Sequence, residues 1–215
     1  MRWLAPLTTV ACLLLAIVTM TAGAASTEPA DIPACEELLT VRQARVAMHE
    51  PTAFILSRQV EGSVRACYYA GGSPGSKKVG HSIGVNWGPY AEFRKWFGKG
   101  ELTEAMCDAS ADACKAIKDA AKQRSNLKSL GAVVKVLGRV GTVRSLRGLA
   151  FKGSPPAFVW LPSDDLAPLD ELAWVLAYDV RSAHLLGVSC TSISHKAPDA
   201  KCAITAARQV FANIT

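Results

Sequence analysis

Alternating apolar and polar positions predict strands in several stretches of the chain. Residues 79–87 alternate most cleanly, and with residues 63–70 they flank a glycine-rich turn, as in a hairpin. Residues 173–180 and 185–190 form a second predicted hairpin, whose first strand is apolar on both faces and is therefore expected near the centre of a sheet. Weaker patterns predict further strands at residues 53–60 and 157–161.

Helical spacing of apolar residues predicts helices between these strands. Residues 35–46 and 101–124 have this spacing, a short helix is expected to open at Pro89, and a final helix is expected from Cys202. The valine-rich residues 131–146 are interpreted as two short strands, or as one strand with a bulge. The pattern predicts an α+β fold: one antiparallel sheet with flanking helices, stapled by disulfides.

The beginning of the chain has the features of a secretory signal peptide. A basic start, an apolar run over residues 4–18 and a small-residue end at residues 22–25 follow each other in the expected order. We therefore divide the chain into a signal peptide (1–25), a linker (26–34) and a single α+β domain (35–215). A retained N-terminal anchor is the alternative. Cleavage would leave an exported protein with no stable membrane span, in the periplasm, on the cell surface or secreted.

Six cysteines follow the predicted signal peptide, and an even number in an exported chain predicts three disulfides. Six cysteines allow 15 connectivities, and loop proximity favours the pairs Cys35–Cys67, Cys107–Cys114 and Cys190–Cys202. Seven positions of unbroken helix would separate two Cα atoms by about 10.5 Å, beyond the ~7 Å limit of a disulfide. The predicted helix therefore breaks near residues 109–111, or each cysteine pairs elsewhere. Metal binding is the alternative, but the chain has no Cys-x-x-Cys pair.

The formal net charge is +6, and the bases are concentrated in one stretch. They predict a basic surface for an anionic partner, such as lipid headgroups, a cell-wall polymer or an acidic protein; a solvated polar face is the alternative. Nucleic acid is not expected as a partner of an exported protein without aromatic residues among the bases. The candidate basic surface comprises Lys115, Lys118, Lys122, Arg124, Lys128, Lys135, Arg139, Arg144, Arg147 and Lys152.

The polar side of the strand at residues 79–87 consists of small residues, which allow another element or a ligand to approach closely. This candidate ligand face comprises Gly80, Ser82, Gly84 and Asn86. A helix of the same domain packed on the glycines is the alternative to a ligand.

Catalytic patterns are weak. Residues 71–75 match Gly-x-Ser-x-Gly, but Pro74 follows Ser73 and has no N–H to donate to an oxyanion, and a strand rather than a helix comes next. The four histidines lack paired metal-ligand spacing; they are His49, His81, His184 and His195. We expect no catalytic centre, no cofactor and no metal, and therefore a protein that is not an enzyme.

Several short motifs together resemble a known family. They are Cys35-x-x-Leu38-Leu39-Thr40 opening a helix, Cys67-x-Tyr69 on a strand, the strand 174–179, and an alanine-rich last helix. This arrangement resembles the small exported proteins of the DUF3558 type and the extracellular sensor domain of a mycobacterial serine/threonine kinase. The resemblance implies an antiparallel sheet flanked by helices, disulfides joining the first helix to the sheet, and a binding or sensing role in the cell envelope.

The first functional hypothesis is therefore an exported binding or interaction module that meets an unknown envelope ligand or protein partner. The alternative is a secreted inhibitor of a hydrolase such as a lysozyme or protease, with the loops at residues 71–78 and 192–201 as inserting elements. A second alternative is a hydrolase that uses Ser73 or His81.

Overall fold

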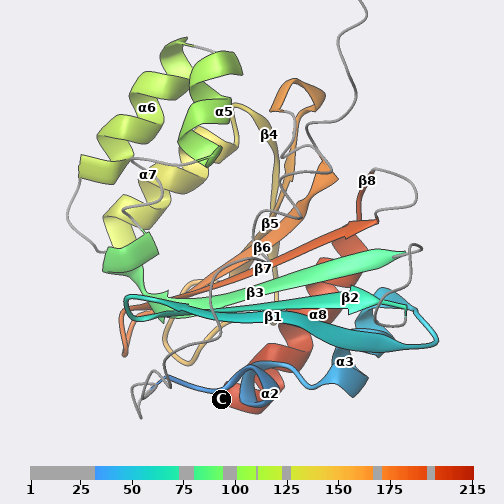
Figure 1. Ribbon diagram of the computed structural model, residues 1–215. Helices are drawn as coiled ribbons and strands as arrows, with labels where there is room; N and C mark the ends of the chain where they lie inside the picture. The colour runs from blue at the N-terminus through green and yellow to red at the C-terminus, as the bar shows by residue number, and fades with distance from the viewer. Residues whose placement is uncertain are drawn as a thin grey trace, which may run out of the picture.

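The computed structural model describes residues 32–72, 80–93, 101–109, 111–122, 127–166, 171–192 and 197–215. Within these residues seven strands form one antiparallel sheet in the order β1-β2-β3-β7-β6-β5-β4, and the short β8 pairs with the end of β7 (Figure 1). The strands are β1 (Ala53–Glu61), β2 (Val64–Gly71), β3 (His81–Pro89), β4 (Gly141–Leu146), β5 (Ala157–Pro162), β6 (Ala173–Asp179), β7 (His184–Ser192) and β8 (Ala197–Pro198).

Helices pack on both faces of this sheet, so the chain has the predicted α+β fold. One face is covered by α2 (Cys35–Leu38), α3 (Val41–Met48) and α8 (Ala200–Ile214), and the other by α5 (Glu101–Ala109), α6 (Ala111–Lys122) and α7 (Leu127–Leu137) (Figure 1). A 3-10 turn, η1 (Asp164–Leu166), follows β5. None of the helices in the described ranges has the length and apolar character required to cross a membrane.

The two helical layers enclose two hydrophobic cores. The first lies between the sheet and α8, whose buried positions recur at helical spacing; half of them are alanine, so the helix can lie close to the strands. The second lies under α5, α6 and α7 and includes Met106, Ile117, Trp160 and Leu176. The sheet is therefore buried on both faces along β5, β6 and β7, as the apolar pattern of residues 173–180 predicted.

Two predicted elements differ from the structure. Of the region predicted as strand, residues 131–137 belong to the helix α7, whereas residues 141–146 form the strand β4 as expected. The helix forms because Leu130, Val133 and Leu137 recur every three to four positions and point into the second core. Valine favours strands only weakly, and helical packing overrides it here. The predicted helix at 35–46 is divided at Leu39, because the Thr40 side chain accepts the N–H of Gln43 and caps a new helix, α3.

All three predicted disulfides are present. They join Cys35 to Cys67, Cys107 to Cys114 and Cys190 to Cys202. The break predicted near residues 109–111 is confirmed, since α5 ends at Ala109, α6 begins at Ala111, and the Cα atoms of Cys107 and Cys114 are 4.1 Å apart. Three disulfides indicate an oxidising environment outside the cytoplasm.

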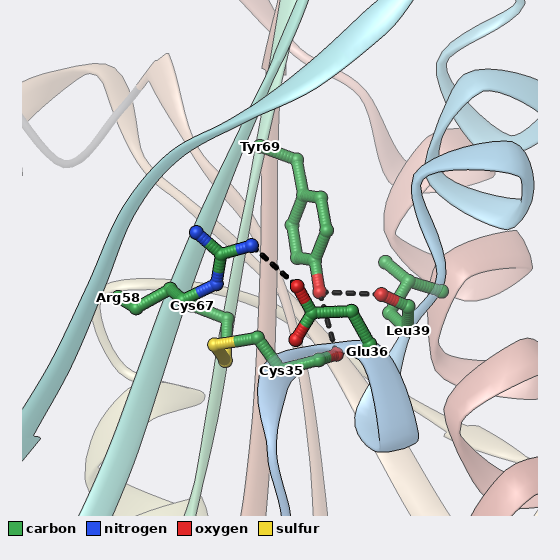
Figure 2. A network of polar contacts seen from close by, with 6 residues as sticks. All are labelled: Cys35, Glu36, Leu39, Arg58, Cys67 and Tyr69. Atoms are coloured by element: carbon green, nitrogen blue, oxygen red, sulfur yellow. Dashed lines mark hydrogen bonds and ion pairs between the residues drawn. A yellow bond between two sulfur atoms is a disulfide. The ribbon is translucent and has the colours of Figure 1, made fainter.

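A polar network fixes the first helix to the sheet. Figure 2 shows Tyr69 of β2 extending toward α2, where its hydroxyl lies 2.8 Å from the carbonyl oxygen of Cys35 and 2.5 Å from that of Leu39. Beside it, Arg58 of β1 donates to the carboxylate of Glu36. The Arg58 guanidinium holds the pKa of Glu36 below its usual range, and burial raises the pKa of Tyr69. This network and the Cys35–Cys67 bridge attach α2 to two adjacent strands.

Candidate functional site

The alternation predicted for the third strand is confirmed. Ile83 and Val85 point into the first core, and Ser82, Gly84 and Asn86 point to the opposite face of β3. Gly80 precedes the strand and lies outside this row. Three of the four residues of the candidate ligand face therefore lie on one side of a central strand.

Strand β7 extends this row of small and polar residues. Its register places Thr191 opposite Ser82, Ser189 opposite Gly84 and Gly187 opposite Asn86. We call these six residues the β3–β7 face. Opposed residues of an antiparallel pair lie on the same side of the sheet, so all six residues face the same surface.

Two aromatic residues flank the β3–β7 face. Tyr68 of β2 pairs with Gly84, and Trp174 of β6 pairs with Ser189, which gives one row across four strands. A Cβ atom on Gly84 would lie 2.7 Å from the Ser189 hydroxyl oxygen and 3.4 Å from the Tyr68 ring. Gly84 is therefore needed for the close approach of these two side chains.

The β3–β7 face and its flank contain buried hydrogen-bonding groups. Asn86 and Ser189 are 6% and 8% exposed. The Trp174 indole nitrogen and the Thr191 hydroxyl oxygen are also buried, and neither has a hydrogen-bond partner in the part of the chain that the structure describes. An unsatisfied buried polar group costs about 1–3 kcal/mol. These two atoms lie on the same side of neighbouring strands, because Thr191 is two positions beyond the residue opposite Trp174.

Gly80 belongs to a different cluster at the start of β3. The Glu50 side chain, just beyond α3, lies against both Gly71 and Gly80, and a Cβ atom at either glycine would overlap it. The Glu50 carboxylate is 2.8 Å from His81 Nδ1, and the Asp199 carboxylate is 3.6 Å from His81 Nε2. Asp199 also accepts the Cys202 N–H and caps α8. This cluster joins β3 to the ends of two helices.

The geometry of His81 does not match that of a catalytic base. Such a base needs one ring nitrogen held by an orienting group and the other directed at a nucleophile. Both ring nitrogens of His81 face carboxylates instead. His184 stacks on Trp87 and bonds the Ser182 carbonyl, and His49 ends α3 in a left-handed conformation.

Within the described residues, no group of three His, Cys, Asp or Glu side chains is placed to hold a metal ion. His195 and Ser73 lie outside those residues, as do residues 73–78 and 193–196 of the two loops considered as inserting elements of an inhibitor. The signal peptide and most of the linker also lie outside them.

The candidate basic residues fall into separate groups. Lys115, Lys118 and Lys122 are exposed on α6, although Lys122 is paired with Asp119 at 3.3 Å, and Lys135 is exposed on α7. Arg144 is exposed on β4, where it follows Val143 of the second core and so points away from α7. The other exposed bases lie in turns beside these elements: Arg139, Arg147 and Lys152. Arg124 and the Lys128 side chain lie outside the described part of the chain.

The sequence pattern did not predict four residues of this site: Tyr68, Trp174, Ser189 and Thr191. A signal for the last two was available, since residues 187, 189 and 191 are Gly, Ser and Thr at alternate positions, as on the earlier strand. Comparison with family models, curated proteins and solved structures found no match to this chain. The resemblance to the DUF3558 type therefore stays a prediction.

Proposed function

We propose that this protein is an exported binding or sensing module of the cell envelope, with the β3–β7 face and its aromatic flank as the ligand-contacting surface. The observation that carries the proposal is the pair of buried groups, Trp174 Nε1 and Thr191 Oγ1, without partners among the described residues. A ligand that offers hydrogen-bonding oxygens to both groups would recover the free energy that their burial costs.

Two further features support a binding role. Four of the six residues of the face are glycine or serine, which lets a ligand approach the strands closely, and Tyr68 and Trp174 provide flat apolar surface on either side. His81, the histidine of the proposed hydrolase alternative, has a carboxylate beside each ring nitrogen and holds β3 to two helices. A binding module therefore fits the described residues better than a hydrolase.

Replacement of Thr191 by Val tests the proposal in the protein without ligand. Valine keeps the shape and removes the unsatisfied hydroxyl, so the free energy of unfolding in urea is expected to rise by about 1–2 kcal/mol. The matched control is Thr142→Val on the exposed part of β4, where we expect a change within about 0.5 kcal/mol. A loss of stability in the Thr191 variant would mean that the hydroxyl already has a partner.

The same variant tests binding. Protein purified from its own envelope fraction is weighed under native and then denaturing conditions, and a retained ligand appears as extra mass in the native spectrum alone. We expect this mass in the wild type and in Thr142→Val, and a clear loss of it in Thr191→Val and Trp174→Phe. Equal occupancy in all four proteins, or none in the wild type, would refute a ligand site on this face.

A further inference from the structure

The three disulfides differ in exposure. Cys35, Cys67, Cys190 and Cys202 are each 1% exposed or less, and all four belong to the first hydrophobic core. Cys107 and Cys114 are both partly exposed. This bridge is therefore the most accessible of the three to an external thiolate, whereas the other two lie in the core and must first be uncovered by local unfolding.

The exposed bridge also differs in what it joins. Cys107 lies in the last turn of α5 and Cys114 in the first turn of α6, so the bridge holds two neighbouring helices of the layer that covers the second core (Figure 1). Each of the buried bridges joins a helix to a strand of the sheet. Opening the exposed bridge leaves the sheet and the helices of the first core covalently connected.

The surroundings of the two sulfur atoms are unequal. Residues three or four apart share one side of a helix, which places the exposed Glu104 beside Cys107 and the exposed Lys118 beside Cys114. The helix dipole adds to this difference, because Cys107 is near the carboxyl end of α5 and Cys114 near the amino end of α6. Both effects stabilise a thiolate at Cys114 more than at Cys107.

We propose that the Cys107–Cys114 bridge is a thiol–disulfide exchange site for an external dithiol. A thiolate of the dithiol attacks the Cys107 sulfur, and the sulfur–sulfur bond breaks with its electron pair leaving on Cys114. The second thiol of the dithiol then attacks the mixed disulfide, releases Cys107 and closes the dithiol into its own disulfide. Two electrons pass to the protein, whose two thiolates take up the protons of the dithiol. Attack falls on the Cys107 sulfur because the Cys114 thiolate is the more stabilised of the two and is therefore the better leaving group.

Partial reduction of the native wild-type protein tests the site. The protein is exposed to limiting dithiothreitol at pH 7, samples are quenched with acid and alkylated, and each cysteine peptide is followed by mass spectrometry. Cys107 and Cys114 are expected to be labelled at least tenfold faster than the four core cysteines, with the far-ultraviolet circular dichroism unchanged. Labelling of any core bridge at the same rate or earlier would overturn the proposal.

Single-thiol variants test the direction of attack. Cys107→Ser leaves Cys114 as the free thiol, and Cys114→Ser leaves Cys107, so each variant serves as the control of the other. The alkylation rate with iodoacetamide at pH 7 is expected to be at least threefold higher for Cys114, because only the thiolate reacts. Equal rates, or a faster Cys107, would refute the order of attack.

Discussion

Replacement of Tyr69 by Phe tests the attachment of the first helix to the sheet. The ring is fully buried, and its hydroxyl reaches two main-chain carbonyl oxygens at once (Figure 2). The Cys35 carbonyl also accepts the N–H of Leu39, so it keeps a partner in the variant. The loss therefore falls mainly on the Leu39 carbonyl, at the point where the chain passes from α2 to α3.

The expected cost follows from that geometry. A buried acceptor that loses its donor destabilises the fold by about 1–3 kcal/mol, which for a domain of this size lowers the melting temperature by roughly 2–4 °C per kcal/mol. Phenylalanine fills the same space, so no cavity term is added. The Cys35–Cys67 bridge keeps α2 near β2 in the variant and should prevent complete detachment.

The assay is urea unfolding of oxidised wild type and variant, followed by tryptophan fluorescence. Tyr178→Phe is the control, since the Tyr178 ring is buried but the described residues provide no side-chain hydrogen bond to its hydroxyl. Burial raises the pKa of Tyr69. The stability that its protonated hydroxyl provides is therefore present below about pH 10 and is lost as the pH rises above that value. A Tyr69 variant no less stable than the control, or a difference that grows above pH 10, would refute this account.

Two further predictions concern carboxylates. Asp199→Ala removes the cap of α8 and one partner of His81, and should lower the free energy of unfolding in urea by about 0.5–2 kcal/mol. Asp199→Asn keeps the cap, so an equal loss of stability in that variant would show that the His81 contact dominates. The Arg58 guanidinium lowers the pKa of Glu36, so the pair stabilises the fold above about pH 4.3 and this contribution is lost as the pH falls. Both side chains are half exposed, so Glu36→Gln should flatten the pH dependence between pH 5 and pH 3 by less than 1 kcal/mol, and an unchanged slope would contradict the pairing.

The sequence predicted those parts of the fold that depend on nearby residues. The alternation around Ile83 and Val85 gave the two faces of β3, and short loops gave the disulfide partners. The strand prediction at residues 131–137 was wrong because the high valine content suggested a strand. The spacing of Leu130, Val133 and Leu137 is instead that of a helix.

The candidate site could be predicted only in part. Ser82, Gly84 and Asn86 lie on one strand, so their common face follows from the period of two. Tyr68 and Trp174 join them through the register between four strands, and no local pattern specifies that register. The contact between Glu50 and Gly80 likewise depends on how α3 ends against the sheet.

The placement of the bridges has a consequence for the order of oxidative folding. Their sequence separations are 32, 7 and 12, so each closes a short loop. The central strand pair of the sheet is β3 with β7. In the sequence these two strands are separated by all of the second helical layer and by three other strands, and none of the three bridges links the chain before this interval to the chain after it. The complete native set of disulfides can therefore form before the sheet closes. Closure of the β3–β7 pair would then be the slow, non-local step, and a species with all six cysteines correctly paired would precede the native state.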